Sequence, residues 1–431
     1  MIKESEYKKR RDTLAKGFLK NSIAVIFSAK EATRSNDTHH PYRQDSNFYY
    51  LCGFKEDNSA LMFIKTKKGL KTALFVHKKD KTLELWNGKR LGVKEAKKRF
   101  LVDEVYEIDE FKDIFKASIK GKKNIYFEIN SKKSTLNKIL KSTKFFKEKL
   151  DIIAHVQKMR LIKSASEIKL IRESIAITAK AHHRAMSMNK EGKYEYQLQA
   201  EVEHEFRHNA AYSDAYTSIV ACGNNANTLH YIENSKPLVD GELILIDAGC
   251  EHNYYASDIT RTIPVNGKFS EPQKELYNLV LDTQLKVISM IKPKIMRSRL
   301  QEEAEKLLTE GMIKLGILNG SVKKAIKEQK HKKYYPHGIG HWMGIDVHDP
   351  APYRDKNNKE IALREGMVLT IEPGLYIDKD DKSVPKKFRG IGIRIEDDIL
   401  VTKDGCENLS SSIAKTIEEV EIICHISKRD I

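Results

Sequence analysis

The chain contains, at residues 335–349, the stretch Tyr335-Pro336-His337-Gly338-Ile339-Gly340-His341-Trp342-Met343-Gly344-Ile345-Asp346-Val347-His348-Asp349. Glycine has no Cβ, so the glycines between the histidines let the backbone pass close to a bound group. Histidine is the commonest neutral nitrogen ligand for metals and the usual proton carrier near pH 7. A glycine-rich surface loop with incidental histidines would also explain this stretch taken alone, so its interpretation depends on the residues that accompany it.

Four acidic residues accompany it, each in or beside an apolar, strand-like run: Asp247, Asp258, Glu372 and Glu396. Residues 243–247 predict a buried strand that delivers a carboxylate at its end. Such a carboxylate is costly to bury unless it is paired or metal-bound, and a buried strand end offers few lysine partners. The next apolar run, residues 254–263, contains Asp258, and residues 249–253 between the two runs can form a turn. We therefore expect the two aspartates to face each other across a hairpin.

The second pair of acids repeats this design. Residues 367–374 form an apolar run that ends in Glu372, and the run 392–401 contains Arg394 and Glu396. Side chains two apart on a strand share a face, so Arg394 is expected to hold the Glu396 carboxylate in place. Helices are expected at 165–187, opened by a Ser164–Glu167 capping box, and at 195–209, 271–291 and 299–315. The pattern predicts a diverged duplication in which each half supplies two carboxylates.

Four carboxylates and one imidazole form a hard-oxygen donor set. Such a set suits Mn²⁺, Co²⁺, Fe²⁺ or Zn²⁺ and not a soft-metal site. Four acids around a single ion would be overcharged, whereas two ions would balance them. The sequence therefore predicts a site for two divalent cations that includes His341.

The positive charge of the chain is unevenly distributed. Residues 1–160 contain 38 Lys and Arg against 20 Asp and Glu, whereas residues 161–431 contain 39 against 40, for a net charge of +17. A chain of 431 residues exceeds one ordinary core. Both observations predict two domains, 1–160 and 161–431. The lysines of the first domain are scattered and match no nucleic-acid-binding module, so we interpret them as a solvated surface and expect no nucleic-acid partner.

Cysteine usage and the chain start bear on the compartment. The five cysteines are an odd number without CxxC spacing, which favours free thiols in a reducing compartment: Cys52, Cys222, Cys250, Cys406 and Cys424. The first residues lack the apolar segment of a signal peptide. No apolar run approaches the ~20 residues that span a bilayer. A cytoplasmic protein with no membrane partner is expected.

Five motifs together carry a resemblance to a known family: Asp247-Ala-Gly, Asp258-Ile-Thr-Arg-Thr, His337-Gly-Ile-Gly-His341, Ile-Glu372-Pro-Gly and Arg394-Ile-Glu396. They resemble the dimetal site of the pita-bread metallopeptidases, which include methionine aminopeptidase, prolidase, aminopeptidase P and the metal-free creatinase. Segments at 33–37, 42–54, 85–92, 264–269 and 407–410 are similar to aminopeptidase P, so the resemblance covers nearly the whole chain. It implies an α/β chain: a C-terminal pita-bread α+β domain with a pseudo-twofold repeat, after a smaller mixed α/β domain.

The resemblance also implies a role for each matching residue. Asp247 would chelate one metal, Asp258 and Glu396 would bridge the pair, and His341 and Glu372 would complete the other. His230, His337 and His348 match the family's non-ligand histidines, which bind substrate and move protons. Arg394 and Tyr376 match an arginine and a tyrosine that contact the ligands and substrate. Asp37 and Trp86 lie in segments that, in oligomers of the family, approach a neighbouring subunit's active site.

The implied activity is hydrolysis of the bond between any N-terminal residue and a following proline, by attack of a metal-bridging hydroxide. The expected cofactors are two divalent ions, Mn²⁺ first, with Co²⁺, Zn²⁺ or Fe²⁺ as alternatives. The expected partners are peptides with proline second and further copies of the chain, as a dimer or tetramer. A prolidase restricted to Xaa-Pro dipeptides shares the five ligands and stays open as an alternative. A pseudo-enzyme that binds nucleic acid or histones is disfavoured, because such relatives lose ligands and this chain keeps all five.

Overall fold

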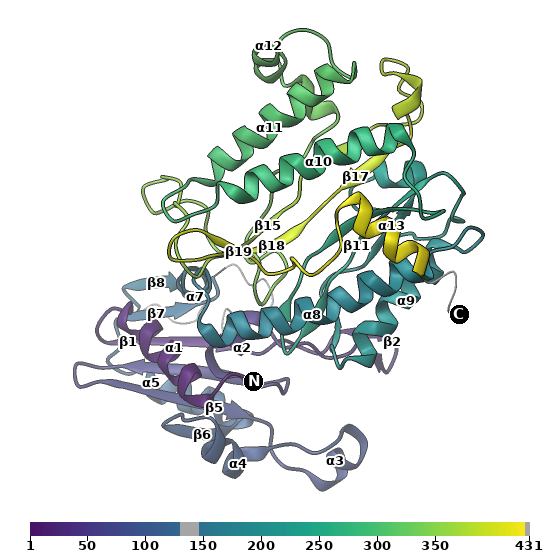
Figure 1. The fold of residues 1–431 in the computed structure, drawn as a ribbon. Helices are drawn as coiled ribbons and strands as arrows, with labels where there is room; N and C mark the ends of the chain where they lie inside the picture. The colour runs from purple at the N-terminus through teal and green to yellow at the C-terminus, as the bar shows by residue number, and fades with distance from the viewer. Residues whose placement is uncertain (130–145, 427–431) are drawn as a thin grey trace. The chain divides into compact units, whose positions relative to one another are not determined.

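The structure is a computed structural model that describes residues 1–129 and 146–426 (Figure 1). The chain divides into two compact units, Met1–Arg160 and Leu161–Ile431. Within the described residues, no helix combines the length and the apolar character that crossing a membrane requires.

The first unit is built on a six-stranded mixed sheet with the order β6-β5-β4-β1-β7-β8. Its strands are β1 (Ser22–Phe27), β4 (Ala60–Lys65), β5 (Leu70–Val76), β6 (Glu104–Glu107), β7 (Asn124–Phe127) and β8 (Glu148–Asp151), and a small separate hairpin joins β2 (Thr33–Ser35) to β3 (Thr38–His39). Its helices are α1 (Glu4–Lys16), α2 (Ser46–Cys52), α3 (Lys81–Asn87), α4 (Gly92–Arg99), α5 (Phe111–Ser118) and α7 (Ile152–Arg160).

Alternate residues of these strands pack on opposite faces of the sheet, as the two-residue period of a strand requires. Phe111 and Phe115 of α5 join one face, in a cluster with Met62 of β4. On the other face, the ring of Phe18 contacts Phe63 and Tyr126. The first unit therefore has a core of its own.

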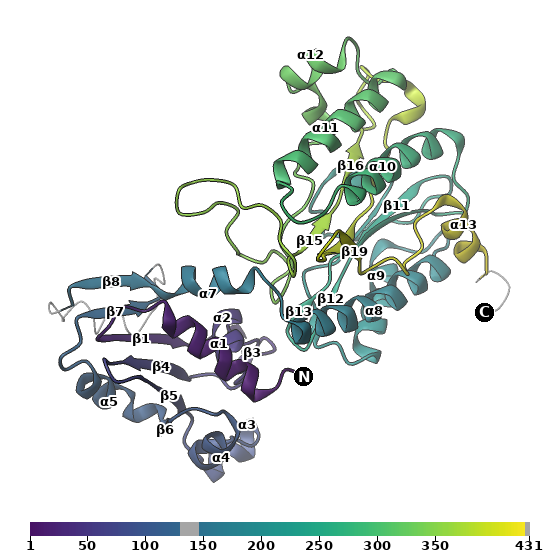
Figure 2. The same ribbon diagram turned by 60° about the vertical axis from the view of Figure 1, so that its left-hand side comes forward.

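The second unit holds the helices and strands around the predicted site (Figure 2). Its helices are α8 (Ala165–Met188), α9 (Glu195–His208), α10 (Glu271–Ser289), α11 (Arg297–Lys314), α12 (Val322–Lys327) and α13 (Ile417–Ile426). Its strands are β9 (Ser213–Asp214), β10 (Ile219–Cys222), β11 (Leu243–Asp247), β12 (Cys250–His252), β13 (Tyr255–Ala256), β14 (Thr260–Pro264), β15 (Val368–Ile371), β16 (Gly374–Tyr376), β17 (Gly392–Arg394), β18 (Asp397–Val401) and β19 (Cys406–Asn408). The predicted capping box opens α8, since Ser164 and Glu167 satisfy each other's backbone N–H groups.

Two antiparallel strand pairs form the centre of this unit and repeat one design. Strand β11 pairs with β14, with Asp247 opposite Thr260. Strand β15 pairs with β18, with Ile371 opposite Asp397. Each pair belongs to its own three-stranded sheet, β10-β11-β14 or β15-β18-β19. This arrangement is the two-part repeat that the sequence predicts.

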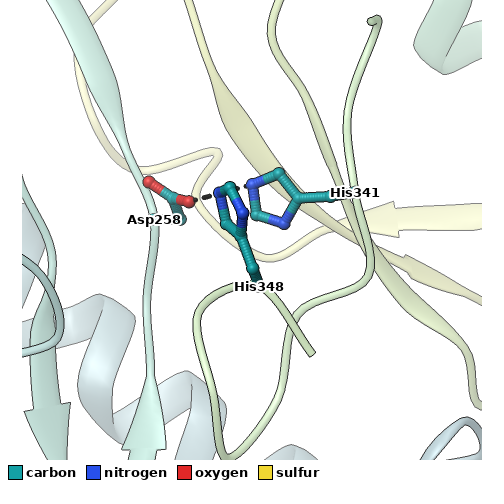
Figure 3. Close-up of side chains that lie close together, drawn as sticks. All are labelled: Asp258, His341 and His348. Carbon is teal, nitrogen blue, oxygen red and sulfur yellow. Dashed lines mark ion pairs between the residues drawn. The ribbon is translucent and has the colours of Figure 1, made fainter. Parts of the chain in front are cut away.

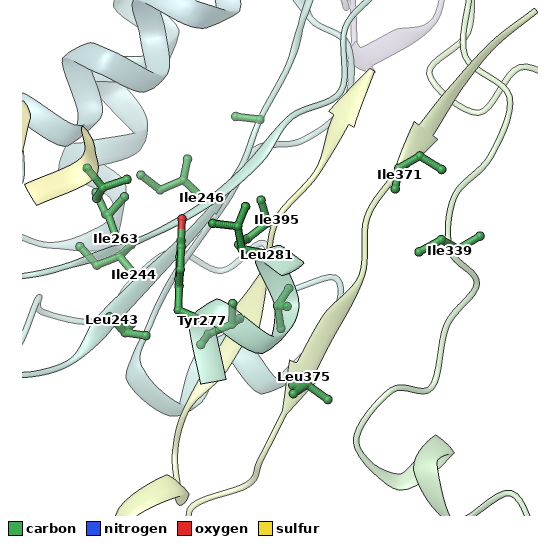
Figure 4. Packing of buried hydrophobic residues seen from close by; sticks show 14 of the residues in the cluster. Leu243, Ile244, Ile246, Ile263, Tyr277, Leu281, Ile339, Ile371, Leu375 and Ile395 are labelled. Atoms are coloured by element: carbon green, nitrogen blue, oxygen red, sulfur yellow. The ribbon is translucent and has the colours of Figure 1, made fainter. Parts of the chain in front are cut away.

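A continuous hydrophobic core supports both strand pairs. Figure 4 shows Tyr277 and Leu281 of α10 among residues of β11, β14 and the segment after β17, with Ile246, Ile263 and Ile395 close by. Full burial of a side chain of this size contributes about 1.5–3 kcal/mol. Because the interior is close-packed, the strand ends that carry the acids are held in fixed positions.

Two of the expected strands are interrupted. The run 254–263 is divided into β13 and β14, and the run 392–401 into β17 and β18. The chain turns at Asn253 and Tyr254, both with positive φ, and not across residues 249–253 as a simple hairpin would require. The reason is that β12 and β13 form a separate hairpin, which pairs with β9 in another sheet. Asp258 and Glu396 lie in the two interruptions.

Candidate metal centre

All four acids lie where a strand ends or is interrupted. Asp247 is the last residue of β11, and Glu372 directly follows β15. Asp258 lies two residues before β14, where its N–H donates to the side chain of Asp398 (Oδ2, 3.1 Å) and not to a backbone carbonyl of a paired strand. Glu396 directly precedes β18. Carboxylates at strand ends can turn out of the sheet toward a common point.

The side chains do converge. Their donor atoms form three overlapping groups, each within 4.8 Å: Asp247 with Asp258 and Glu396; His341 with Glu372 and Glu396; and Asp258 with His341 and His348. The structure thus brings together all five residues that the sequence predicts as ligands. It also places His348 within reach of the same space, so the distances alone do not separate His348 from the ligands.

Hydrogen bonds from neighbouring side chains hold the carboxylates of Asp247 and Glu396 in place. Asp247 accepts from Arg394 Nη2 at 2.5 Å and from the Tyr216 hydroxyl at 2.7 Å. Glu396 accepts from Thr260 Oγ1 at 2.7 Å, and Thr260 Oγ1 in turn accepts from Arg394 Nε at 3.2 Å. The sequence predicts that Arg394 holds the Glu396 carboxylate in place. In the structure Arg394 ion-pairs with Asp247, and its hydrogen bonds reach Glu396 through the Thr260 hydroxyl.

The centre is short of positive charge. Burial, together with the neighbouring carboxylates, raises the pKa of Glu396 well above its ordinary value. Burial raises the pKa of Glu372 to about 7 although His341 and Arg394 oppose it. Buried acids in this state lack compensating cations. A set of four carboxylates and an imidazole therefore fits divalent cations, and Asp247, Asp258, His341, Glu372 and Glu396 would hold them.

His341 is aimed into this space by its glycine-rich loop, which runs alongside β15. A Cβ on Gly340 would lie 1.9 Å from the Thr370 carbonyl oxygen, so only glycine allows this approach. His341 Nδ1 donates to the Trp342 carbonyl at 3.1 Å, and this leaves Nε2 facing Asp258 at 3.2 Å (Figure 3). Burial lowers the pKa of His341, but Asp258 and Glu372 outweigh it and raise the pKa to about 9. A nitrogen held in this orientation is suited to a metal.

His337 belongs to a hydrogen-bonded chain. Its Nδ1 donates to the Gly338 carbonyl at 2.9 Å, so its Nε2 accepts from the Tyr376 hydroxyl at 2.8 Å. That hydroxyl accepts from Arg394 Nη1 at 3.0 Å. Burial lowers the pKa of His337 to about 4, so the ring is neutral near pH 7. This series of hydrogen bonds connects His337, through Tyr376 and Arg394, to Asp247.

A cavity of about 520 Å³ opens above the donors. His348 and His230 line it, and both are exposed. The His348 ring lies over that of His341 with centroids 3.9 Å apart, as Figure 3 also shows. Apolar walls come from Ile219, Leu229, Ile232 and Val347. An apolar recess beside polar groups suits a small side chain next to a peptide bond.

Three predicted substrate-contacting residues do not line this cavity. Tyr376 is buried behind His337, where it bonds Arg394 and His337. Asp37 follows β2 in the first unit and is exposed. Trp86 lies on α3, with 80% of its surface exposed. The roles predicted for Asp37 and Trp86 depend on another copy of the chain and stay predictions.

Sequence reasoning missed Tyr216 and Thr260, which donate hydrogen bonds to the acids. Tyr216 donates to Asp247, and burial raises the pKa of its hydroxyl well above 10, so it remains a donor. No spacing or motif around Tyr216 indicates this contact. Thr260 lies two residues after Asp258, inside a motif that the sequence had singled out, and its place opposite Asp247 in the ladder could have indicated a role.

Comparisons with known proteins agree with this geometry. Residues 169–403 match metallopeptidase family M24, and residues 7–126 match the aminopeptidase P N-terminal domain. The chain is 42% identical over 422 residues to a Xaa-Pro aminopeptidase of Haemophilus influenzae, with 97% of each chain covered. It superposes on a zinc-substituted Escherichia coli aminopeptidase P in complex with product (TM-score 0.96, 38% identity, all of both chains). It also superposes on Pseudomonas aeruginosa aminopeptidase PepP (TM-score 0.96, 39% identity, 100% of this chain and 99% of that one).

These matches confirm the fold class predicted from the sequence, a pita-bread domain that follows a smaller mixed α/β domain. Because family M24 consists of metallopeptidases, they also give the acid-rich centre its chemical context. The chain belongs to metallopeptidase family M24.

Proposed function

We propose that this protein is an aminopeptidase that hydrolyses the bond between an N-terminal residue and a following proline, with two divalent cations, Mn²⁺ first, held by the five predicted ligands. The observation that carries the proposal is the convergence of those five donors beneath one cavity with three further histidines. Relatives at 39–42% identity along nearly their whole length are named Xaa-Pro aminopeptidase, which supports the proline specificity.

The bond before proline poses a particular recognition problem. Its amide nitrogen carries no hydrogen, so an enzyme cannot grip this bond through an N–H group. The site must instead hold the free α-amine and the pyrrolidine ring. The carboxylates offer a negative environment for the amine, and Leu229 and Ile232 offer apolar walls.

When bound, the cations would supply an activated water and polarise the scissile carbonyl. The chain's own residues bind, orient and move protons. His337 presents a neutral ring whose orientation is fixed by Tyr376 and Gly338. His348 is exposed as a residue, but its ring is partly desolvated where it packs on His341. This desolvation and the His341 charge lower the pKa of His348, so its ring is available near neutral pH to accept a proton and return it to the leaving proline nitrogen. His230 on the rim would stabilise negative charge on the carbonyl oxygen.

The prolidase alternative differs in what lies beyond the proline. An enzyme restricted to dipeptides must capture the proline carboxylate, whereas an aminopeptidase must let the chain continue. We therefore expect Mn²⁺-reconstituted protein to cleave Xaa-Pro-Xaa and longer peptides at least as well as Xaa-Pro, with release of the first residue. Exclusive dipeptide hydrolysis would favour prolidase, and equal cleavage with alanine in place of proline would contradict both.

The first unit is proposed to control substrate access and to form oligomer contacts. Its exposed Trp86 and Asp37 support a role at a second subunit, in a dimer or tetramer. Light scattering would give the oligomeric state. Trp86→Ala should raise KM for peptides and leave metal content unchanged, and an unchanged KM in a confirmed oligomer would remove Trp86 from the site. The five cysteines are all free thiols, which supports the prediction of a reducing, cytoplasmic compartment.

A further inference from the structure

Glu195, the first residue of α9, is a fully buried carboxylate outside the metal centre. Across residues 1–129 and 146–426, no Lys, Arg or His forms an ion pair with it. A buried charge without a cation is costly unless hydrogen bonds replace the lost water. Glu195 therefore requires an explanation that the metal centre does not supply.

Hydrogen bonds fill the acceptor capacity of this carboxylate. Oε1 accepts from the Cys222 N–H at 2.7 Å and from Asn225 Nδ2 at 2.8 Å. Oε2 accepts from the Tyr231 hydroxyl at 2.7 Å and from the Lys236 N–H at 2.9 Å. An ionised carboxylate has about four lone-pair sites, and all are used here. All four donors belong to residues 222–236.

Residues 222–236 are the segment that carries His230. Between β10 and β11 the described chain contains only the short 3₁₀ helix η2 (Gly223–Asn227) as regular structure. Leu229, His230 and Ile232 of this segment line the cavity. The His230 ring is exposed, and no hydrogen bond to it is found among the described residues. Its position is therefore set by the backbone on either side of it.

A second contact from the same helix supports this arrangement. Gln199, four residues after Glu195 and on the same face of α9, accepts from Asn234 Nδ2 at 2.8 Å. Asn234 has a φ of +48° and also bonds Val220 N and Ser218 O. Helix α9 thus holds the far end of the segment through Asn234 and both ends through Glu195.

We propose that Glu195 is a positioning residue for the reaction: it joins both ends of segment 222–236 to α9 and so fixes His230 over the cavity. This inference rests on the proposed function, because it needs His230 to contact the substrate. The four donors also explain why the residue is glutamate. A glutamine amide would turn an NH₂ group toward two of the donors, and aspartate is one methylene too short to reach all four.

The test compares three variants for kcat and KM on an Xaa-Pro-Xaa peptide, metal content and thermal unfolding. Glu195→Gln should lower kcat/KM about tenfold with both metals retained. Tyr231→Phe removes a single donor and should give a smaller loss in the same direction. The matched control is Glu201→Gln on the same helix, which breaks an ion pair with Arg184 (2.7 Å) away from the segment and should leave kcat/KM unchanged.

A double-mutant cycle separates positioning from general stability. In a His230→Ala background, Glu195→Gln should cost less than twofold in kcat/KM, because the group it positions is already gone. A full tenfold loss in that background, or wild-type activity of Glu195→Gln alone, would overturn the proposal.

Hydrogen–deuterium exchange gives a readout that does not need turnover. Glu195→Gln should accelerate exchange across residues 222–236 and leave β11 and β15 protected. Unchanged exchange in that segment would overturn the positioning role. If the wild-type protein cleaves no Xaa-Pro peptide, the proposed function fails, and the exchange result still decides whether Glu195 holds the segment.

Discussion

Two buried charge clusters meet at consecutive residues, Glu396 and Asp397, and they are electrostatic opposites. Asp397 accepts from Arg261 Nη2 at 2.7 Å and from Lys415 Nζ at 2.5 Å. Ser410 and Asn408 complete its hydrogen bonds. Burial alone would raise the pKa of Asp397, but Arg261 and Lys415 hold it well below the ordinary value. Glu396, equally buried, has its pKa raised.

The two clusters differ in how much positive charge lies beside their carboxylates. Asp397 is a single acid with two cations, whereas the metal centre gathers four acids around Arg394 and His341. Burial of a carboxylate therefore does not by itself indicate a metal site. A deficit of positive charge around converging carboxylates does.

The largest expected effect comes from substitutions in the metal centre, whose carboxylates lack compensating positive charge. Glu396→Gln, or Asp258→Asn, should abolish turnover and lose metal, because both residues are predicted bridges and removal of a bridge undoes the pair. The protein should still fold, because the variant removes a negative charge from a centre that has too many. Metal analysis, peptide assays and circular dichroism check the three parts.

A Glu396→Gln variant that keeps two metals and near-normal activity would contradict the ligand assignment. Wild-type protein stripped of metal by a chelator provides the matched control. Both samples should be folded and inactive, and only the wild type should recover activity when Mn²⁺ is restored.

Asp397→Asn should have the opposite effects, a loss of stability with metal binding retained. It leaves the buried Arg261 and the half-buried Lys415 without their counter-charge, and breaking the buried Arg261–Asp397 pair costs about 3–5 kcal/mol of unfolding free energy. Urea denaturation of the metal-free protein measures this loss directly. The fraction that remains folded should still bind metal, since Asp397 lies outside the donor groups. Equal stabilities for Asp397→Asn and Glu396→Gln would remove the distinction between the clusters.

His348→Ala should produce a smaller effect than loss of a ligand. We expect both metals to stay bound and kcat to fall at least ~10²-fold, the range for a positioned acid–base group. Because His348 lies within 4.8 Å of Asp258 and His341 donor atoms, metal analysis of this variant is decisive. Loss of one metal would show that His348 is a ligand.

The two clusters also show which features of the site the sequence predicts and which it does not. An apolar run that ends in an acid is a local pattern, so the positions of Asp247 and Glu372 at strand ends were predictable, as was the Ser164 capping box. The interruptions at Asp258 and Glu396 were not, because long-range contacts such as Asp258 N–H to Asp398 create them. Glu195 was predictable only as a helix start, since its partners are 27 to 41 residues away.

The smallest expected effect is a pH dependence that separates the two clusters in metal-free protein. Glu372 has a pKa of about 7 when folded against 4.5 unfolded, so the folded state binds the proton more tightly. Its contribution to stability is full below pH 4.5 and is lost as pH rises through 7. His341, with its pKa raised to about 9, contributes in the same direction above pH 6.5. Asp397 behaves oppositely: its contribution is present above pH 3.8 and is lost only as pH falls below that value, so it stays constant between pH 5 and 7. Glu396, whose pKa is also raised, contributes in the same direction as Glu372. Urea denaturation of chelated protein should therefore show a loss of about 2 kcal/mol or more between pH 5 and 7, and Glu372→Gln should reduce this loss. Bound metal should reverse the trend, because cations compete with protons for the same oxygens. If the unfolding free energies of wild type and Glu372→Gln depended on pH identically, positive charge would already compensate the Glu372 carboxylate. Glu372 would then not differ from Asp397 in this respect.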